Sequence, residues 1–140
     1  MSFRPLAARR WIAAAAQSVA ADHGGDAGRI WSDEPMTDQL QHRFVAFTGI
    51  GHQKAAMAVE ILGRDIGMPI TAPGRSDIAY DVHLRRVILR TRLAARGDRD
   101  HVIARERELH PKRPGKLDFP AWLVGRGRWH PGAPDGAPAR

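Results

Sequence analysis

The spacing of the apolar side chains constrains this chain more than any other feature of its sequence. These side chains recur every three or four residues, as they do on one face of a helix, and no run alternates convincingly between apolar and polar residues. Glycines and prolines, 14 and 10 in number, interrupt the pattern between the helical runs. With 140 residues, 43% of them hydrophobic, the chain is long enough for one domain with a modest core. The sequence therefore predicts an all-α fold.

The periodicity predicts six helices joined by loops. Gly24 and Gly25 close the first helix, since glycine tolerates a left-handed conformation at a helix end. Thr37 is predicted to cap the second helix and Asp98 to cap the fifth. Proline and glycine make residues 63–79 a loop. The third helix follows Gly51 and carries Ala55, Ala58, Val59 and Leu62 on its apolar face. The other predicted helices cover residues 6–21, 38–47, 81–93, 98–110 and 117–124, in a domain of residues 1–124 that is followed by an irregular tail, residues 125–140.

Positive charge is concentrated in the second half of the chain. The formal net charge is +7 at neutral pH. Residues 1–60 contain six basic and six acidic side chains, whereas residues 85–113 contain ten basic and four acidic ones. A basic segment of this kind is typical of a surface that faces a polyanion such as nucleic acid. The alternative is an arginine-rich face that is simply solvated.

Two glycines one residue apart, Gly49 and Gly51, stand where the third helix begins, in the stretch FTGIGHQKA. Together with the flanking helices they predict a helical hairpin of residues 38–62. Backbone N–H groups at a helix start have no partner inside the helix, so a DNA phosphate can accept hydrogen bonds from them. A purely structural turn is the alternative and the more common meaning of so short a motif. The candidate DNA-binding residues here are Gly49, Ile50, Gly51, His52, Gln53 and Lys54, with Ile50 expected to pack inward.

Asp81 stands at the start of a basic and apolar helical segment, residues 80–94, which begins YDVHLRRVILR. A carboxylate in this position is commonly an N-cap. It is also suited to catalysis if it faces a cleft beside the hairpin, where it could stabilise an oxocarbenium-like sugar or activate a water molecule. Arg85 and Arg86, on the polar side of the same helix, are further candidate DNA contacts.

The two motifs together, FTGIGHQKA and then YDVHLRRV, resemble the helix–hairpin–helix (HhH-GPD) DNA glycosylase superfamily, which includes endonuclease III and the adenine and alkylbase glycosylases. The family signature is L-P-G-[IV]-G-x-x-[ST]-A followed, after a loop, by V-D-[TV]-H-[VIL]-x-R-[VIL]. The segment LDFPAWLVGRGRWHPGAPDG resembles the family's last helix and iron–sulfur loop. The resemblance implies a partial six-helix barrel with C-terminal helices, Asp81 as the catalytic aspartate, and Gly49 to Gly51 as a DNA backbone contact.

One departure from the family concerns lyase chemistry. Bifunctional members place a lysine nucleophile two residues after the second hairpin glycine. This chain has Gln53 at that position and Lys54 one residue later. One residue is about 100° of rotation on a helix, so Lys54 should not reach the same point. We therefore expect a monofunctional enzyme without lyase activity.

Two further departures concern cofactors and completeness. The chain has no cysteine, so disulfides, thiolate zinc sites and the family's iron–sulfur cluster are excluded, and we expect no cofactor. Full-length family members also have several helices before the segment that matches Arg4 to Trp11, and those helices line the lesion pocket. The alternative to an active enzyme is therefore a truncated, inactive remnant that binds DNA backbone or needs a partner chain to supply the missing helices.

The sequence thus predicts a monofunctional DNA glycosylase of base excision repair, which acts on double-stranded DNA and hydrolyses the N-glycosidic bond of a damaged or mismatched base. The seven histidines contain no pair at i, i+4 spacing, and we predict no metal site. No apolar run approaches the roughly 20 residues of a membrane span. We expect a cytoplasmic, nucleoid-associated location and no membrane partner.

Overall fold

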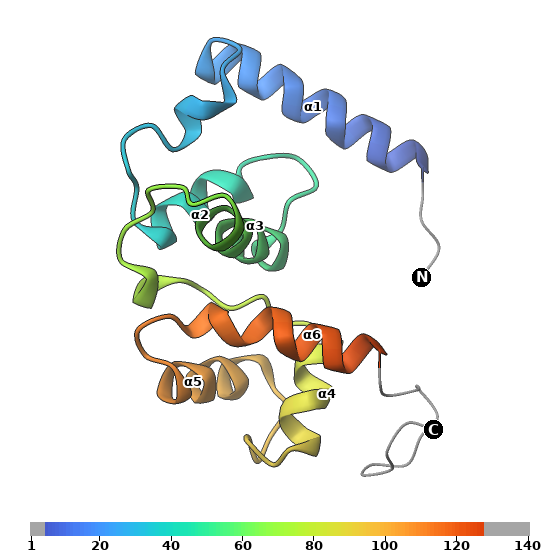
Figure 1. The fold of residues 1–140 in the computed structure, drawn as a ribbon. Coiled ribbons are helices and arrows are strands. Elements are labelled where there is room, and N and C mark those ends of the chain that lie inside the picture. The colour runs from blue at the N-terminus through green and yellow to red at the C-terminus, as the bar shows by residue number, and fades with distance from the viewer. Residues whose placement is uncertain (1–4, 128–140) are drawn as a thin grey trace.

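The computed structural model describes residues 5–127, and this part of the chain is helical (Figure 1). Within it no β-strand forms, and Met36 and Thr71 make an isolated parallel bridge. The predicted all-α class is confirmed. The helices are α1 (Pro5–His23), α2 (Thr37–Val45), α3 (His52–Asp65), α4 (Val82–Arg90), α5 (Arg99–Leu109) and α6 (Asp118–Gly127), with short 3₁₀ turns η1 (Ala27–Ile30), η2 (Pro73–Arg75) and η3 (Pro114–Leu117).

Two separate apolar clusters divide the molecule into halves. We call residues 5–65, with α1 to α3, the hairpin half, and residues 78–127, with α4 to α6, the aspartate half. Figure 1 shows the first above the second. Helices α2 to α5 bury residues of the apolar stripes that their periodicity predicts. The first cluster is built on Ile30, Leu40, Phe47 and Val59, and the second on Ile78, Leu84, Ile88, Ala94, Val102 and Ile103.

Helix α6 joins the two halves through a row of ring contacts. The Arg64 guanidinium, near the end of α3, lies 4.6 Å from the centroid of the Phe119 ring. Phe119 stacks on Trp122 with their centroids 6.2 Å apart. The Trp122 ring meets the edge of His83, in the first turn of α4, at 6.4 Å. α6 therefore lies between the end of α3 and the start of α4.

Helix α1 is only partly buried. It begins one residue earlier and ends two residues later than predicted. Ala15 and Val19 pack against the apolar cluster of the hairpin half. Trp11 and Ile12 remain 41% and 71% exposed, although both belong to the predicted apolar stripe. No other part of the described structure therefore buries these two side chains.

Thr37 is the first residue of α2 and not, as predicted, its N-cap. Its amide donates a hydrogen bond to the carbonyl of Thr71 at 3.0 Å, and its hydroxyl donates to the carbonyl of Ala72 at 2.7 Å. Met36 occupies the N-cap position, and its amide donates to the Gln39 side chain at 3.0 Å. The Thr37 hydroxyl is therefore engaged in a tertiary contact with the loop that contains Thr71 and Ala72, and it does not cap α2.

Two other helix ends differ from the prediction. Helix α3 continues to Asp65, so the loop begins later than residue 63. Helix α4 ends at Arg90 and not at Leu93, because Arg92 adopts a left-handed conformation with φ of +58°. Helix α5, by contrast, begins as predicted, since the Asp98 carboxylate accepts a hydrogen bond from the His101 amide at 3.1 Å.

Helix α6 crosses the predicted start of the irregular tail, since it runs on to Gly127. Gly125 packs directly against the first turn of α4. A Cβ atom at this position would lie 2.9 Å from both the Cβ atom and the carbonyl oxygen of His83. Glycine here reflects close packing of two helices and not a break in the helix. Residues 128–140, the rest of the predicted tail, lie outside the described residues.

Candidate nucleic-acid interface and the Asp81 site

The turn between α2 and α3 is built on Gly49. This glycine has φ of +86°, a conformation that costs other residues about 1–2 kcal/mol. A Cβ atom here would also lie 2.5 Å from the Trp11 ring of α1. Ile50 packs toward the apolar cluster of the hairpin half, as predicted. Gly49 is therefore required by the fold itself, through its backbone conformation and through the side chain that covers it.

Lys54 folds back over the same turn. Its Nζ donates a hydrogen bond to the Gly49 carbonyl at 2.7 Å and lies 4.5 Å from the centroid of the Trp11 ring. The ammonium group therefore holds the turn from one side while Trp11 covers it from another. His52 and Gln53, the other polar residues of the first turn of α3, are exposed. The structure thus brings Gly49, Ile50 and Lys54 together at one end of the hairpin.

Gly51 differs from Gly49 in what surrounds it. It is the N-cap of α3, with an extended backbone at φ of −94°, which any residue can adopt. A Cβ atom at this position would meet no atom within 4 Å. No side chain caps α3, so its first N–H groups face outward without a side-chain acceptor. Nothing in the fold of the described residues demands glycine here, whereas close approach of a ligand to the backbone would.

Asp81 is the N-cap of α4. Its Oδ1 accepts hydrogen bonds from the amides of His83 and Leu84, both at 2.8 Å. The extended backbone of Asp81 and the buried Leu84 place the carboxylate over the first turn of the helix. Among residues 5–127, no group donates a hydrogen bond to Oδ2. The capping role is therefore established, and one carboxylate oxygen is still open to a ligand.

The hairpin turn and Asp81 occupy different halves of the molecule. Asp81 precedes α4 at the point where this helix meets α6. His83, two residues later, contacts the Trp122 ring and lies directly against Gly125. The hairpin helices pack chiefly on each other, around Leu40 and Val59. A ligand that touches both sites would therefore have to span the two halves. The predicted cleft that joins Asp81 directly to the hairpin is not among the described pockets.

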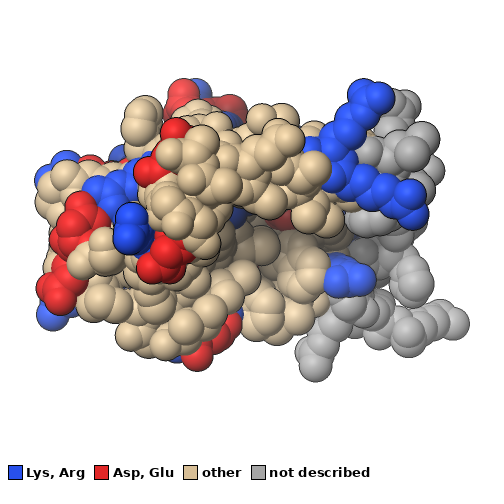
Figure 2. Space-filling view, turned by 90° about the horizontal axis from the view of Figure 1, so that it is seen from above, with Lys and Arg blue, Asp and Glu red and all other residues tan. Residues whose placement is uncertain are grey.

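Much of the basic segment is balanced by carboxylates. Arg85 donates to the Gly97 carbonyl through Nε at 3.0 Å and is exposed, while Arg86 is half-buried. Figure 2 looks onto the opposite side of the molecule, from above α1, where both charges lie at one end and cations lie beside the grey residues at the other. The described ion pairs in this segment are Arg96–Asp98, Arg99–Asp77, Arg99–Asp100, Arg105–Glu108, Arg107–Asp77 and Arg113–Glu60.

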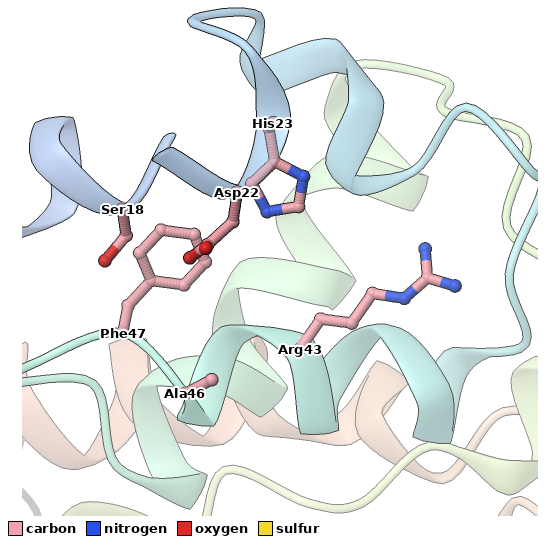
Figure 3. Close-up of a pocket in the computed structure, with 6 residues that line it drawn as sticks. All are labelled: Ser18, Asp22, His23, Arg43, Ala46 and Phe47. Atoms are coloured by element: carbon pink, nitrogen blue, oxygen red, sulfur yellow. The ribbon is translucent and has the colours of Figure 1, made fainter. Parts of the chain in front are cut away.

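A pocket between α1 and α2 collects polar side chains without assembling a catalytic group (Figure 3). It encloses about 170 Å³ and is lined by Ser18, Asp22, His23, Arg43, Ala46 and Phe47. The His23 ring stacks on Phe47 at 6.5 Å. Arg43 turns away and binds both oxygens of Asp33, at 2.7 and 2.6 Å, which lowers the pKa of that carboxyl. No hydrogen bond joins Ser18, Asp22 and His23, so this part of the described structure holds no nucleophilic triad.

Two buried carboxyl groups form the most perturbed electrostatic site. Glu106 of α5 and Asp118 of α6 are 1% and 5% exposed. Burial, and then the neighbouring Asp118 carboxyl, raise the pKa of Glu106 to about 9. Burial likewise raises the pKa of Asp118 to about 7, although its Oδ2 accepts a hydrogen bond from the Ala79 amide at 2.7 Å. Two carboxyl groups this close cannot both ionise readily, so the pair retains a proton at neutral pH.

Sequence reasoning missed this pair. One signal could have revealed it: Glu106 follows Val102 by four residues and Ile103 by three, so it lies on the buried face of α5. No group of three or more potential metal ligands occurs within residues 5–127. Nor does any helix in this range have the length and apolar character needed to span a membrane.

Comparisons with known proteins place this chain in no family. No protein-family model matches it. No curated protein and no solved structure is similar to it. The resemblance to the glycosylases therefore rests on the hairpin and Asp81 motifs of the chain itself.

Proposed function

We propose that this protein binds the backbone of double-stranded DNA through the hairpin turn and the start of α3, and that it is a monofunctional DNA glycosylase of base excision repair. The observation that carries the binding proposal is the open start of α3. Gly51 leaves space in front of N–H groups that no side chain caps, which is the arrangement a phosphate oxygen needs. The helix dipole favours the negative charge at the same point.

The catalytic part of the proposal rests on the resemblance of the motifs and on the free oxygen of Asp81. Oδ1 is held by two amides, which fixes the direction of the carboxylate. Oδ2 accepts no hydrogen bond from residues 5–127, so it is open to a water molecule or to a developing positive charge on a sugar. Lys54 is engaged with the Gly49 carbonyl at 2.7 Å, in keeping with a mechanism that uses no lysine nucleophile.

An inactive module that requires a partner chain is the second candidate, and the exposed apolar side chains favour it. Ile12 on α1 and Leu123 on α6 are 71% and 50% exposed, and Trp11 and Phe119 on the same two helices are 41% and 39% exposed. Apolar side chains left open in this way are typical of a surface that another chain covers. In this case the hairpin would still bind DNA, and hydrolysis would require the second chain.

The test of binding uses Gly51→Ser with a fluorescent DNA duplex. Serine at an N-cap accepts a hydrogen bond from the N–H groups of the first turn, so it stabilises the helix while it competes with a phosphate for those groups. We expect the thermal midpoint to stay level or rise and DNA affinity to fall about tenfold. Unchanged affinity in a folded Gly51→Ser variant would exclude the start of α3 as a phosphate site.

The test of catalysis compares the wild type with Asp81→Asn on a panel of duplexes that carry damaged or mismatched bases. Asparagine caps a helix about as well as aspartate, so this change removes the charge and keeps the fold. If the proposal is right, release of the base is lost in the variant while DNA binding and its decrease with salt persist. Salt-sensitive binding without base release by the wild type on any duplex would favour the module that needs a partner.

A further inference from the structure

The loop segment that leads into Asp81 is held by side chains from other parts of the chain. Gln41 of α2 binds the backbone of Asp77 twice, since its Nε2 donates to the carbonyl at 3.1 Å and its Oε1 accepts from the amide at 2.8 Å. Nearer to Asp81, Oδ2 of Asp118 accepts a hydrogen bond from the Ala79 amide at 2.7 Å. Ala79 and Asp118 are 3% and 5% exposed. A buried carboxyl group therefore fixes the backbone two residues before the N-cap of α4.

The other oxygen of Asp118 faces a second acid. Oδ1 of Asp118 and both oxygens of Glu106 are buried, and none of them meets an N–H or hydroxyl donor of residues 5–127. The two carboxyl groups are hydrogen-bonded to each other, and this bond needs a proton, because a carboxylate only accepts. Burial, and then the Asp118 carboxyl, raise the pKa of Glu106 to about 9, so Glu106 is the donor at neutral pH. Asp118 thus accepts from Glu106 through one oxygen and from the Ala79 amide through the other.

The charged groups that act on Asp118 are all acidic. They are Glu106 of α5, Glu60 of α3 and Asp81 before α4. Arg113 pairs with Glu60 at 3.1 Å, and none of the described ion pairs includes Asp118 or Glu106. Two carboxylates at this place would therefore repel each other in a buried setting without a cation between them. The contact between α5 and the start of α6 depends on the proton of the pair.

We infer that Asp118 is a positioning residue for Asp81, which acts through the Ala79 amide, and that the proton on Glu106 keeps it in this role. While Glu106 donates, Asp118 stays at the Ala79 amide, and the backbone that leads into α4 keeps its course. When the proton leaves, repulsion moves Asp118 away and the buried amide loses its acceptor. The Asp81 carboxylate then changes its direction over the first turn of α4. The consequence for base release rests on the proposed function, whereas the link between the three acids does not.

The first experiment follows the side-chain carboxyl carbons of the isotope-labelled protein by NMR from pH 6 to pH 10. We expect the Glu106 signal to show a protonated group at pH 7 and to titrate at about pH 9, and the Asp81 signal to shift in the same step. Glu106→Gln donates an N–H at every pH, so in this variant the step at Asp81 should disappear. A Glu106 carboxyl that is ionised at pH 7 would overturn the inference, and so would an Asp81 signal without a step near pH 9.

Variants of Asp118 test the hydrogen bond itself. Asp118→Ala leaves the Ala79 amide without an acceptor, so the two hydrogen bonds to the Asp81 carboxylate should open more often. The amides that make them should exchange hydrogen about tenfold faster at pH 6.5. Asp118→Asn retains an oxygen acceptor and should restore most of the protection. Val102→Ala opens a cavity in the apolar cluster of the same half, so it controls for lost stability and should leave this local exchange close to that of the wild type.

Base release tests the consequence for the proposed function. At saturating DNA, Asp118→Ala should lower kcat about tenfold without changing the affinity for the duplex, because it displaces Asp81 and not the hairpin turn. The wild type should lose activity above about pH 9, and Glu106→Gln should retain it there. Absence of base release from the wild type would overturn the proposed function alone, since the NMR and exchange measurements do not depend on it. Equal exchange in the wild type and a folded Asp118→Ala variant would overturn the inference whatever the activity.

Discussion

The two halves of the molecule begin their central helices in opposite ways. Helix α4 follows Asp81, whose carboxylate accepts hydrogen bonds from two amides of the first turn at 2.8 Å. Helix α3 follows Gly51, which has no side chain and leaves the equivalent N–H groups open. A carboxylate stabilises its own helix start, whereas a glycine leaves that start free for another acceptor. The hairpin half is therefore suited to receive a phosphate, and the aspartate half to hold a fixed carboxylate.

The buried acidic side chains of the two halves also differ in their neighbours. Glu60 of α3 is buried in an ion pair with Arg113, with an N–O distance of 3.1 Å. Glu106 of α5 is buried beside a second carboxyl group and has no cationic partner among the described ion pairs. A pair of opposite charges remains ionised on burial, whereas two carboxyl groups in contact retain a proton. Alkaline pH should therefore destabilise the aspartate half and spare the hairpin half.

The largest predicted effect is this loss of stability at high pH. The folded pKa of Glu106 is about 9 and that of Asp118 is about 7, against 4.5 and 3.8 for the free groups. Because both are raised, the folded state keeps protons that the unfolded state releases, and each pKa unit is worth about 1.4 kcal/mol. The stabilising effect is complete below about pH 4, and it is lost as pH rises through 7 and 9. Urea titrations at pH 5, 7 and 9 should show a steady decrease in the free energy of unfolding.

Glu106→Gln is the control for the pH dependence. A neutral side chain of nearly the same size keeps the packing and cannot ionise, so most of the decrease between pH 5 and 9 should disappear. The acids whose pKa is lowered, Asp33, Asp65 and Asp98, titrate below this range and should not interfere. An equally steep decrease in the variant would mean that the buried pair is not its source.

The second prediction concerns the two hairpin glycines. Gly49→Ala places a methyl group 2.5 Å from the Trp11 ring, at φ of +86°. The strained backbone and the steric overlap together should lower the free energy of unfolding by about 2–4 kcal/mol. Gly51→Ala is the matched control, because it adds the same methyl group in open space at an ordinary φ. The difference between the two midpoints in a urea titration measures how far the turn depends on Trp11. Equal losses would contradict the close packing of α1 on this turn.

Local signals in the sequence predicted the helices and two of the caps. Apolar spacing located the buried faces, with Leu40, Leu84 and Ile88 in the cores, and Asp81 and Asp98 cap their helices as their positions indicate. The resemblance and the proposed roles of the site residues remain predictions.

Features set by distant parts of the chain could not be predicted. Residues 71 and 72 bind Thr37, and Trp11 covers Gly49 from a helix 38 residues earlier. Such contacts depend on how the helices pack and leave no periodic signal.

The third prediction tests the packing that positions Asp81. Gly125→Ala would place a methyl group 2.9 Å from the Cβ atom and the carbonyl oxygen of His83, in the first turn of α4. Because these are partly backbone atoms, they cannot rotate away, and overpacking of this kind costs about 1–3 kcal/mol. The aspartate half should lose stability, and any hydrolytic activity should decrease with the displacement of α4. Thermal unfolding and base release measured on the same sample should both be affected. Gly67→Ala is a poor comparison, since its φ is +69°, so Gly51→Ala again serves as the control for the added methyl group. This control applies to thermal unfolding alone, because Gly51 belongs to the proposed phosphate site.

The smallest predicted effect separates the two roles of Asp81. Asp81→Ala removes both hydrogen bonds to the first turn of α4, and loss of such a cap costs about 1 kcal/mol. Asp81→Asn keeps an oxygen acceptor and should cost less than half as much. If the carboxylate is also catalytic, both variants should lose base release completely, although only Asp81→Ala loses stability. If the carboxylate is a cap alone, activity on any substrate should follow stability, and Asp81→Asn should stay close to the wild type. Urea titrations of the three proteins, together with base release at saturating DNA, distinguish these outcomes. If Asp81 were purely structural, no variant could lose base release while it keeps its stability.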